Sequence, residues 1–340
     1  MKKNITKTFG FLFTKIVCVA CFTGCTAHKA LPTADAPELI FQTNFEKGTY
    51  MTQTLPQYAE LRGADLSLPK PNDWVADFDG HPNVGTFRLY YEEGDSTQRL
   101  AELVADPVDP KNTVLRYKIS VPNVKMPSSY TKSGIVFSKK SRIQSEMYAN
   151  NGLMEIYQSV KLFIPTDFNK YINSPYPVDG DWLGLCEFWN NAAWMKAPYP
   201  FRFGVTVGRG DPVQGSPLYF KTDGQKLDDI FIEMWHYKNT TYPIPIGKWM
   251  TLEYYIKSGN KGNGRFYFAV SPDGGTKTVI WDLHNDTCHP DDPNPDGFSE
   301  VNSMKLYASD NMVNQMNAMG GTFQVYWDDF KIWKNKKPSL

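Results

Sequence analysis

The sequence predicts an all-β fold, a two-sheet antiparallel sandwich, and three observations support this prediction. Its apolar segments are short and alternate between apolar and polar residues, turn-forming residues separate them at strand-like intervals, and no amphipathic helix of convincing length is present. Aromatic residues are frequent, with nine Trp, 19 Tyr and 21 Phe, and the segments that carry them are among the alternating ones. This pattern is typical of strands with one buried and one solvated face.

Five segments approach the two-residue period of such strands, namely 114–119, 154–164, 250–256, 265–270 and 323–333. Turn signals separate them, at 122–123, 150–152, 165–167, 223–224, 246–247, 260–264 and 272–275. The best helix candidate, 309–319, could equally be a loop. The sequence shows no internal repeat and no Cys/His spacing that would bind zinc.

The first 24 residues predict an export signal. Three lysines precede an apolar stretch that ends at Phe22, and two small residues then precede Cys25. The apolar stretch is too short to cross a membrane, which needs ~20 apolar residues. Residues 22–25 resemble the lipobox of bacterial lipoproteins, which implies a lipid on Cys25 and a location in the cell envelope. Ordinary secretion, a retained anchor and lipidation at Cys21 are the alternatives.

Beyond the signal, residues 25–37 contain two prolines and no hydrophobic pattern, so we expect a tether. Residues 38–335 are then expected to form one β-sandwich domain. Of the cysteines in this body, Cys186 and Cys288, nothing in the sequence decides between a disulfide and two buried thiols.

Charge limits the expected partners. Lys plus Arg and Asp plus Glu number 36 each, so no global field favours nucleic acid. A groove that binds a polyanion would have to be local. We therefore expect a monomer that meets the membrane only through its lipid and has no nucleic-acid partner.

Both ends of the domain resemble concanavalin A-like jelly rolls. Residues 41–48 look like the opening strand of that superfamily and 326–333 like its closing strand, and the two lie side by side in its members. Residues 247–257, followed by a Gly-rich turn and 264–267, resemble its penultimate pair of strands. The resemblance implies a jelly-roll sandwich and favours a polysaccharide or oligosaccharide partner, because grooves lined with Trp and Tyr suit sugar rings.

Three segments resemble landmarks of alginate-lyase-like polysaccharide lyases: 142–146, 187–191 and 255–260. The resemblance implies catalytic roles for Arg142, Glu146 and Lys257, and substrate contacts for the residues Trp189, Asn190, Asn191 and Tyr255. The sequence also departs from the lyase pattern. Glu187 replaces a neutralising Gln, Trp189 replaces a His, and Lys261 stands where a Tyr is expected. A non-catalytic glycan-binding protein on the same scaffold is therefore an alternative.

Hydrolysis is a further alternative, which requires two carboxyl groups in different protonation states. Glu187 lies in an aromatic segment that would raise its pKa towards that of a general acid, with Glu146 or Glu233 as its partner. His236 is a candidate base, or an ordinary surface histidine. Arg202 could neutralise a substrate carboxylate or form a cross-strand pair.

No catalytic cofactor is predicted, but a structural Ca²⁺ is. In the jelly rolls that this chain resembles, such an ion often joins the first and last strands through acidic residues, and Glu46 with Asp328 or Asp329 occupy matching positions. The alternative is that these carboxylates pair with Lys47 or Lys331. The aspartates of 284–296 could bind Ca²⁺ or belong to a solvated loop.

Overall fold

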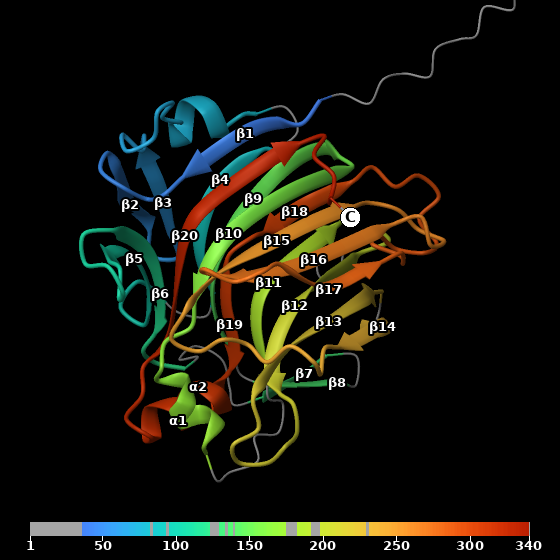
Figure 1. The fold of residues 1–340 in the computed structure, drawn as a ribbon. Helices are drawn as coiled ribbons and strands as arrows, with labels where there is room; N and C mark the ends of the chain where they lie inside the picture. The colour runs from blue at the N-terminus through green and yellow to red at the C-terminus, as the bar shows by residue number, and fades with distance from the viewer. Residues whose placement is uncertain are drawn as a thin grey trace, which may run out of the picture. The chain divides into compact units, whose positions relative to one another are not determined.

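The computed structural model describes residues 36–81, 84–92, 95–122, 129–132, 135–138, 140–174, 182–191, 198–228 and 231–339, and all statements about structure refer to these. Two large antiparallel sheets make up the fold, as the sequence predicts (Figure 1). The protein has a jelly-roll sandwich architecture.

The smaller of the two sheets has eight strands. In spatial order they are β17 (Thr278–Leu283), β16 (Arg265–Pro272), β15 (Trp249–Lys257), β10 (Glu155–Phe163), β20 (Phe323–Lys334), β6 (Thr113–Ile119) and β5 (Arg99–Ala105), with β1 (Glu38–Thr43) also paired to β20. Figure 1 shows β1, near the start of the described chain, beside β20 at its end. The expected pairing of the terminal strands is therefore confirmed.

The larger sheet has ten strands. Their spatial order is β14 (Phe231–Lys238), β13 (Leu218–Leu227), β12 (Phe201–Arg209), β11 (Leu183–Asn190), β18 (Phe298–Asn302), β9 (Lys140–Leu153), β4 (Thr86–Glu92), β3 (Tyr58–Gly63) and β2 (Thr49–Leu55). Strand β19 (Lys305–Ser309) pairs with both β11 and β9, in line with β18.

The remaining elements are short. A hairpin joins β7 (Ser129–Lys132) to β8 (Ile135–Ser138), a π-helical turn spans Trp74–Phe78, and the α-helices are α1 (Phe168–Ile172) and α2 (Asp310–Ala318). The segment 309–319, for which the sequence allowed a helix or a loop, contains helix α2. No helix within the described ranges has the length and apolar character needed to cross a membrane.

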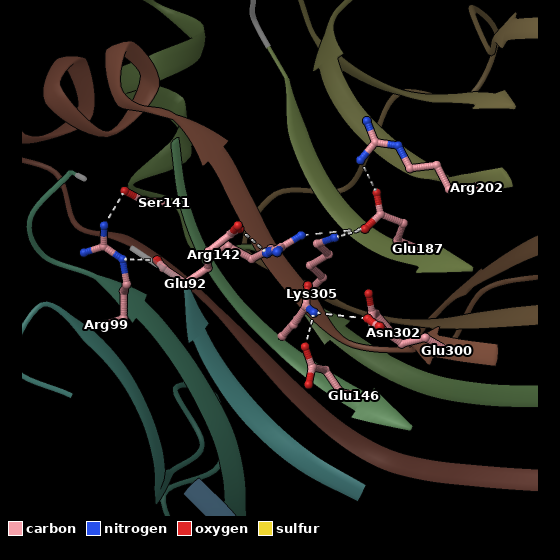
Figure 2. A network of polar contacts seen from close by, with 11 residues as sticks. Glu92, Arg99, Ser141, Arg142, Glu146, Glu187, Arg202, Glu300, Asn302 and Lys305 are labelled. Atoms are coloured by element: carbon pink, nitrogen blue, oxygen red, sulfur yellow. Dashed lines mark hydrogen bonds and ion pairs between the residues drawn. The ribbon is translucent and has the colours of Figure 1, made fainter. Parts of the chain in front are cut away.

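The two sheets pack face to face through aromatic side chains. The ring of Phe188 in β11 lies 6.0 Å from Tyr254 in β15, and Phe220 in β13 lies 5.0 Å from Phe268 in β16. A polar contact adds to this packing, because fully buried Arg99 of β5 donates to Ser141 in β9 (2.9 Å) and to the Glu92 carbonyl in β4 (3.0 Å; Figure 2). These contacts hold the ten-stranded sheet with its other face towards solvent.

The fold decides two predictions made from the sequence. The turn expected at 223–224 is wrong, because both residues lie inside β13. Glycine is required at position 224 because the Trp235 indole of β14 packs against it, and a Cβ at this position would lie 2.2 Å from a ring atom.

Cys186 and Cys288 are both free and buried, so of the two alternatives that the sequence left open, two buried thiols is correct.

Candidate functional site

The solvent-facing side of the ten-stranded sheet is polar across its middle strands, and we call it the polar face. In β9, Ile143 and Met147 point into the core, whereas Arg142, Gln144 and Glu146 point outwards. This alternation follows from the two-residue period of a strand. The polar face is therefore where the candidate residues of β9, β11 and β12 meet.

Glu187 in β11 is an acidic residue of this face, and Figure 2 shows Arg142, Arg202 and Lys305 directed towards it. One carboxylate oxygen accepts from Arg202 of β12 at 3.0 Å; the other bonds to the ammonium of Lys305 in β19 and lies 3.9 Å from Arg142. Each of these cations comes from a different strand. Of the two roles considered for Arg202, the structure shows the cross-strand pair, which it forms with Glu187.

The electrostatic prediction for Glu187 is wrong. Burial would raise the pKa of its carboxyl, but the charges of Lys305, Arg202 and Arg142 outweigh burial and hold the pKa well below its usual range. Glu187 is therefore ionised at neutral pH and is unsuited to be a general acid. The aromatic residues beside Glu187 are visible in the sequence, but the contact of its carboxylate with three cations is not.

Sequence reasoning missed Tyr307, a half-buried residue of β19. Three cations lie against its ring, with Lys305 Nζ at 4.7 Å, the Arg142 guanidinium at 5.1 Å and Lys140 Nζ at 5.5 Å from the centroid. The ring of Trp182 meets it edge to face at 4.5 Å. The Lys-x-Tyr alternation of 305–307 was the available signal.

The two lysines near Tyr307 differ in their pKa values. Burial lowers the pKa of Lys305 to about 8, against the opposing charge of Glu187. Burial also acts on Lys140, but its interaction and hydrogen bond with Tyr307 and the charge of Glu92 outweigh it and raise the pKa of Lys140. Lys140 thus keeps its positive charge beside the phenol.

These residues form what we call the Tyr307 cluster, which consists of Tyr307, Lys140, Arg142, Arg202, Lys305, Glu187 and Glu92. Glu92 completes it by binding the Arg142 Nε at 2.6 Å. Four cations face two carboxylates, so the cluster carries an excess of two positive charges. Such an excess attracts an anionic ligand.

A pocket of about 450 Å³ opens onto the cluster. Tyr307, Lys140, Lys305, Glu187 and Arg202 line it, and strands β13 and β14 provide its opposite wall. His236 is on that wall, where its Nδ1 lies 3.4 Å from Glu233 and its side chain is 46% exposed. The pocket has the size and mixed lining of a small-molecule or sugar site.

A pair of carboxyl groups lies beside the cluster. Gln144 Nε2 donates to Glu146 at 2.7 Å and to Glu300 of β18 at 3.4 Å, so one amide bridges the two residues. Arg88 holds Glu146 at 2.6 Å, and Asn302 donates to Glu300 at 2.8 Å. Burial, and next the charge of Glu146, raise the pKa of Glu300 to about 7. Arg142 and Glu146 lie on the same strand but have different partners, since Arg142 binds Glu92 and Glu146 binds Arg88.

Several predicted site residues lie elsewhere. Tyr255 and Lys257 belong to β15 of the eight-stranded sheet, where Tyr255 donates to Glu155 at 2.8 Å, so the structure does not bring them to the polar face. Asn190 is buried and bonds to the loop at Thr287 and to Ser258, which gives it a structural role. Asn191 donates to the Tyr199 carbonyl beyond the end of β11.

Trp189 does lie at the polar face. The Arg202 guanidinium is 5.4 Å from the centre of its ring, and Trp189 pairs in register with Glu300. Only 8% of the residue is exposed, and its contact with substrate stays a prediction.

The residues predicted to bind Ca²⁺ have protein partners. Glu46 accepts from the Thr113 amide at 2.9 Å, Asp328 accepts from the Asn112 side chain at 3.1 Å, and Asp329 pairs with Lys331 and Lys161. No group of three or more His, Cys, Asp or Glu side chains in the described residues is arranged to hold a metal ion. The Ca²⁺ at the terminal strands stays a prediction.

No protein-family model matches the chain, and no curated protein matches it. Among solved structures, a double mutant of alginate lyase Aly36B with alginate trisaccharide is 11% identical, with a TM-score of 0.39 over 64% of this chain and 80% of that one. An endo-β-1,4-glucuronan lyase from the fungus Trichoderma reesei is 14% identical, with a TM-score of 0.41 over 72% and 89%.

A marine PL-14 alginate lyase from Aplysia kurodai is 12% identical, with a TM-score of 0.39 over 76% of this chain and 92% of that one. At such identities and TM-scores, the likeness carries no argument about activity. What this chain does has to be inferred from the chemistry of its own polar face.

Proposed function

We propose that this protein binds an acidic polysaccharide on its polar face and cleaves it by β-elimination at the Tyr307 cluster. The observation that carries the proposal is the position of Tyr307, a phenol that lines the pocket with three cations within 5.5 Å of its ring centre. A uronic acid unit supplies the matching ligand, with an anionic carboxylate on a sugar ring.

β-Elimination needs positive charge and a proton-transfer group at the same place. The proton next to the uronate carboxylate is removed, its bonding electrons form a carbon–carbon double bond, and the glycosidic oxygen leaves and takes up a proton. Cations beside the carboxylate stabilise the negative charge that develops during proton removal. A Tyr oxygen within reach, in its deprotonated form, accepts the proton from the sugar carbon, and the phenol so formed donates it to the leaving glycosidic oxygen.

The roles follow from exposure and contacts. Lys305 is 1% exposed and bound to Glu187, so its ammonium contributes positive charge rather than a mobile proton. Tyr307 is more accessible and is proposed to move the proton. Arg142 and Lys140 stabilise the carboxylate, and Glu187 holds Arg202 and Lys305 in position.

A second candidate reaction is hydrolysis by Glu300 and Glu146. Glycoside hydrolysis requires two carboxyl groups with different roles, and here Glu300, whose pKa is raised to about 7, lies beside Glu146, which forms an ion pair with Arg88. This pair replaces the Glu187 assignment suggested by the sequence, because Glu187 stays ionised.

We also propose that the protein is exported and carries a lipid on Cys25. The support is the charged, apolar and small-residue pattern of 1–25, which lies outside the described residues. A cell-envelope location would bring the polar face to extracellular or periplasmic glycans.

The test is incubation with a panel of acidic and neutral polysaccharides, in which unsaturated-product absorbance and new reducing ends are measured together. The proposal expects both signals on an acidic polymer. Reducing ends without unsaturated product would support hydrolysis, and binding without either signal would identify a glycan-binding protein. Absence of binding to any acidic polymer would overturn the proposal.

A further inference from the structure

Arg88 of β4 presents a fixed guanidinium on the polar face, away from the Tyr307 cluster. Its carbon Cζ lies 4.3 Å from the ring centre of Tyr58 and 4.2 Å from that of Tyr148, so the group has an aromatic ring near it on each of two neighbouring strands. Glu146 binds its Nε at 2.6 Å. Tyr58 is itself stacked on Tyr90, with centroids 5.1 Å apart and planes at 22°.

The other two nitrogens of Arg88 are available for a ligand. Within the described part of the chain, the terminal Nη1 and Nη2 have neither a hydrogen bond nor an ion pair, and the side chain is 31% exposed. Two parallel N–H groups of a guanidinium match the two oxygens of a carboxylate. Because its contacts already fix the side chain, little conformational freedom is lost when a ligand binds.

Strand register places Arg88 in line with the Tyr307 cluster. Glu187 of β11 pairs with Asn302 of β18. Because Val301 pairs with Met147 in the antiparallel β18–β9 pair, Asn302 lies opposite Glu146 of β9. Glu146 in turn pairs with Arg88 of β4. The row from Glu187 to Arg88 therefore crosses three strand gaps, about 14 Å at the usual spacing of ~4.8 Å. A ligand that reaches both ends must be longer than one sugar ring.

We propose that Arg88, with Tyr58 and Tyr148, forms a distal subsite that binds the carboxylate of a second uronic acid unit of the same chain. The proposal rests on the proposed function and names its substrate more closely: a polymer with carboxylates on more than one sugar, laid across the strands from β11 to β4. The tyrosine rings flank the guanidinium and give apolar surface to a sugar ring.

The test compares binding of oligouronates of increasing length to the full chain and its variants by calorimetry. Arg88→Met is expected to lower the affinity for tetra- and hexauronates about ten-fold, the loss expected for a charge-assisted contact. The affinity of Arg88→Met for the diuronate is expected to stay at the wild-type value, because a diuronate is too short to reach from Glu187 to Arg88. Equal affinities of Arg88→Met and wild type for the hexauronate would overturn the subsite.

Removal of Arg88 also leaves Glu146 without its cation, and this negative charge could by itself repel the ligand. The double variant Arg88→Met/Glu146→Gln removes both charges, and the loss for long oligouronates is expected to persist in it. Restored affinity in the double variant would overturn a direct contact. Arg265→Met is the matched control, because Arg265 also binds one carboxylate (Asp282, 2.8 Å) near a tyrosine, but on the eight-stranded sheet.

The same titrations separate this proposal from the proposed function. If wild type and Arg88→Met bind long oligouronates equally well, the distal subsite is contradicted but the proposed function is not. Wild type that binds no oligouronate overturns both.

Discussion

Glu187 illustrates how the chemistry of a side chain depends on residues that are distant in the sequence. Its neighbours along the chain are aromatic and predict a raised pKa, whereas its neighbours in space are Arg142, Arg202 and Lys305, which lower it. Those cations lie 15 to 118 positions away along the chain. Only the pairing of β9, β11, β12 and β19 brings them together, and no local pattern encodes that pairing.

Glu300 gives a prediction at the residue scale that concerns pH. Its pKa is 4.5 as a free side chain and about 7 in the fold, so the folded state holds more protons than the unfolded state between these values. The stability that this difference supplies is present below pH 4.5 and is lost as pH rises through about 7.

Glu300→Gln removes this dependence because an amide stays neutral. The melting temperature of the variant is therefore expected to rise relative to wild type as pH increases through this window, by an amount equivalent to about 1–2 kcal/mol above pH 7 after allowance for partial exposure. Scanning calorimetry over the pH range measures it. Glu38→Gln, at an exposed carboxylate, is the control, and a constant difference between Glu300→Gln and wild type would contradict the assignment.

At the scale of elements, strand positions were largely predictable and their partners were not. The alternating segments 114–119, 250–256 and 265–270 fall within β6, β15 and β16, because the two-residue period is a local property. Lys257 and Tyr255 were nevertheless assigned to the site, although β15 belongs to the opposite sheet. Sheet membership depends on long-range pairing, which a segment does not reveal by itself.

Gly224 is a second case, because glycine after aspartate usually signals a turn. In this fold it lies within β13, and the indole of Trp235 occupies the space of a side chain. Gly224→Val is therefore expected to destabilise the protein by about 1–3 kcal/mol through overpacking.

Urea denaturation measures this loss, and a double-mutant cycle with Trp235→Ala identifies its cause. The same Gly224→Val substitution is expected to cost less in the Trp235→Ala background, where the ring is absent. An equal cost in both backgrounds would show that the contact with Trp235 is not what requires glycine.

At the scale of the whole molecule, the sequence predicted the two-sheet sandwich and the pairing of its ends, since both depend on strand patterns and on the terminal segments. The Tyr307 cluster was only partly predictable. Arg142, Arg202 and Glu187 were named from the sequence, whereas Tyr307 and Lys305 of β19, Lys140 of β9 and Glu92 of β4 were not. Strand β19 carries no motif beyond its alternation.

The proposed export and lipidation also concern the whole molecule. Cys25→Ala is expected to abolish membrane retention, because the thiol carries the proposed anchor and acyl burial contributes ~0.8 kcal/mol per CH₂. Metabolic labelling with palmitate measures this, with Cys21→Ala as the matched control. Labelling of Cys25→Ala at the wild-type level would contradict the proposed attachment site.

The proton-transfer role of Tyr307 is tested most directly by turnover of Tyr307→Phe on the acidic polysaccharide that wild type cleaves. The account predicts a loss of unsaturated product of at least ~100-fold, the usual contribution of a proton-transfer group, with glycan affinity and melting temperature close to wild type. Tyr50→Phe, at an exposed tyrosine of the same sheet, is the control. Wild-type turnover by a folded Tyr307→Phe protein would contradict the account.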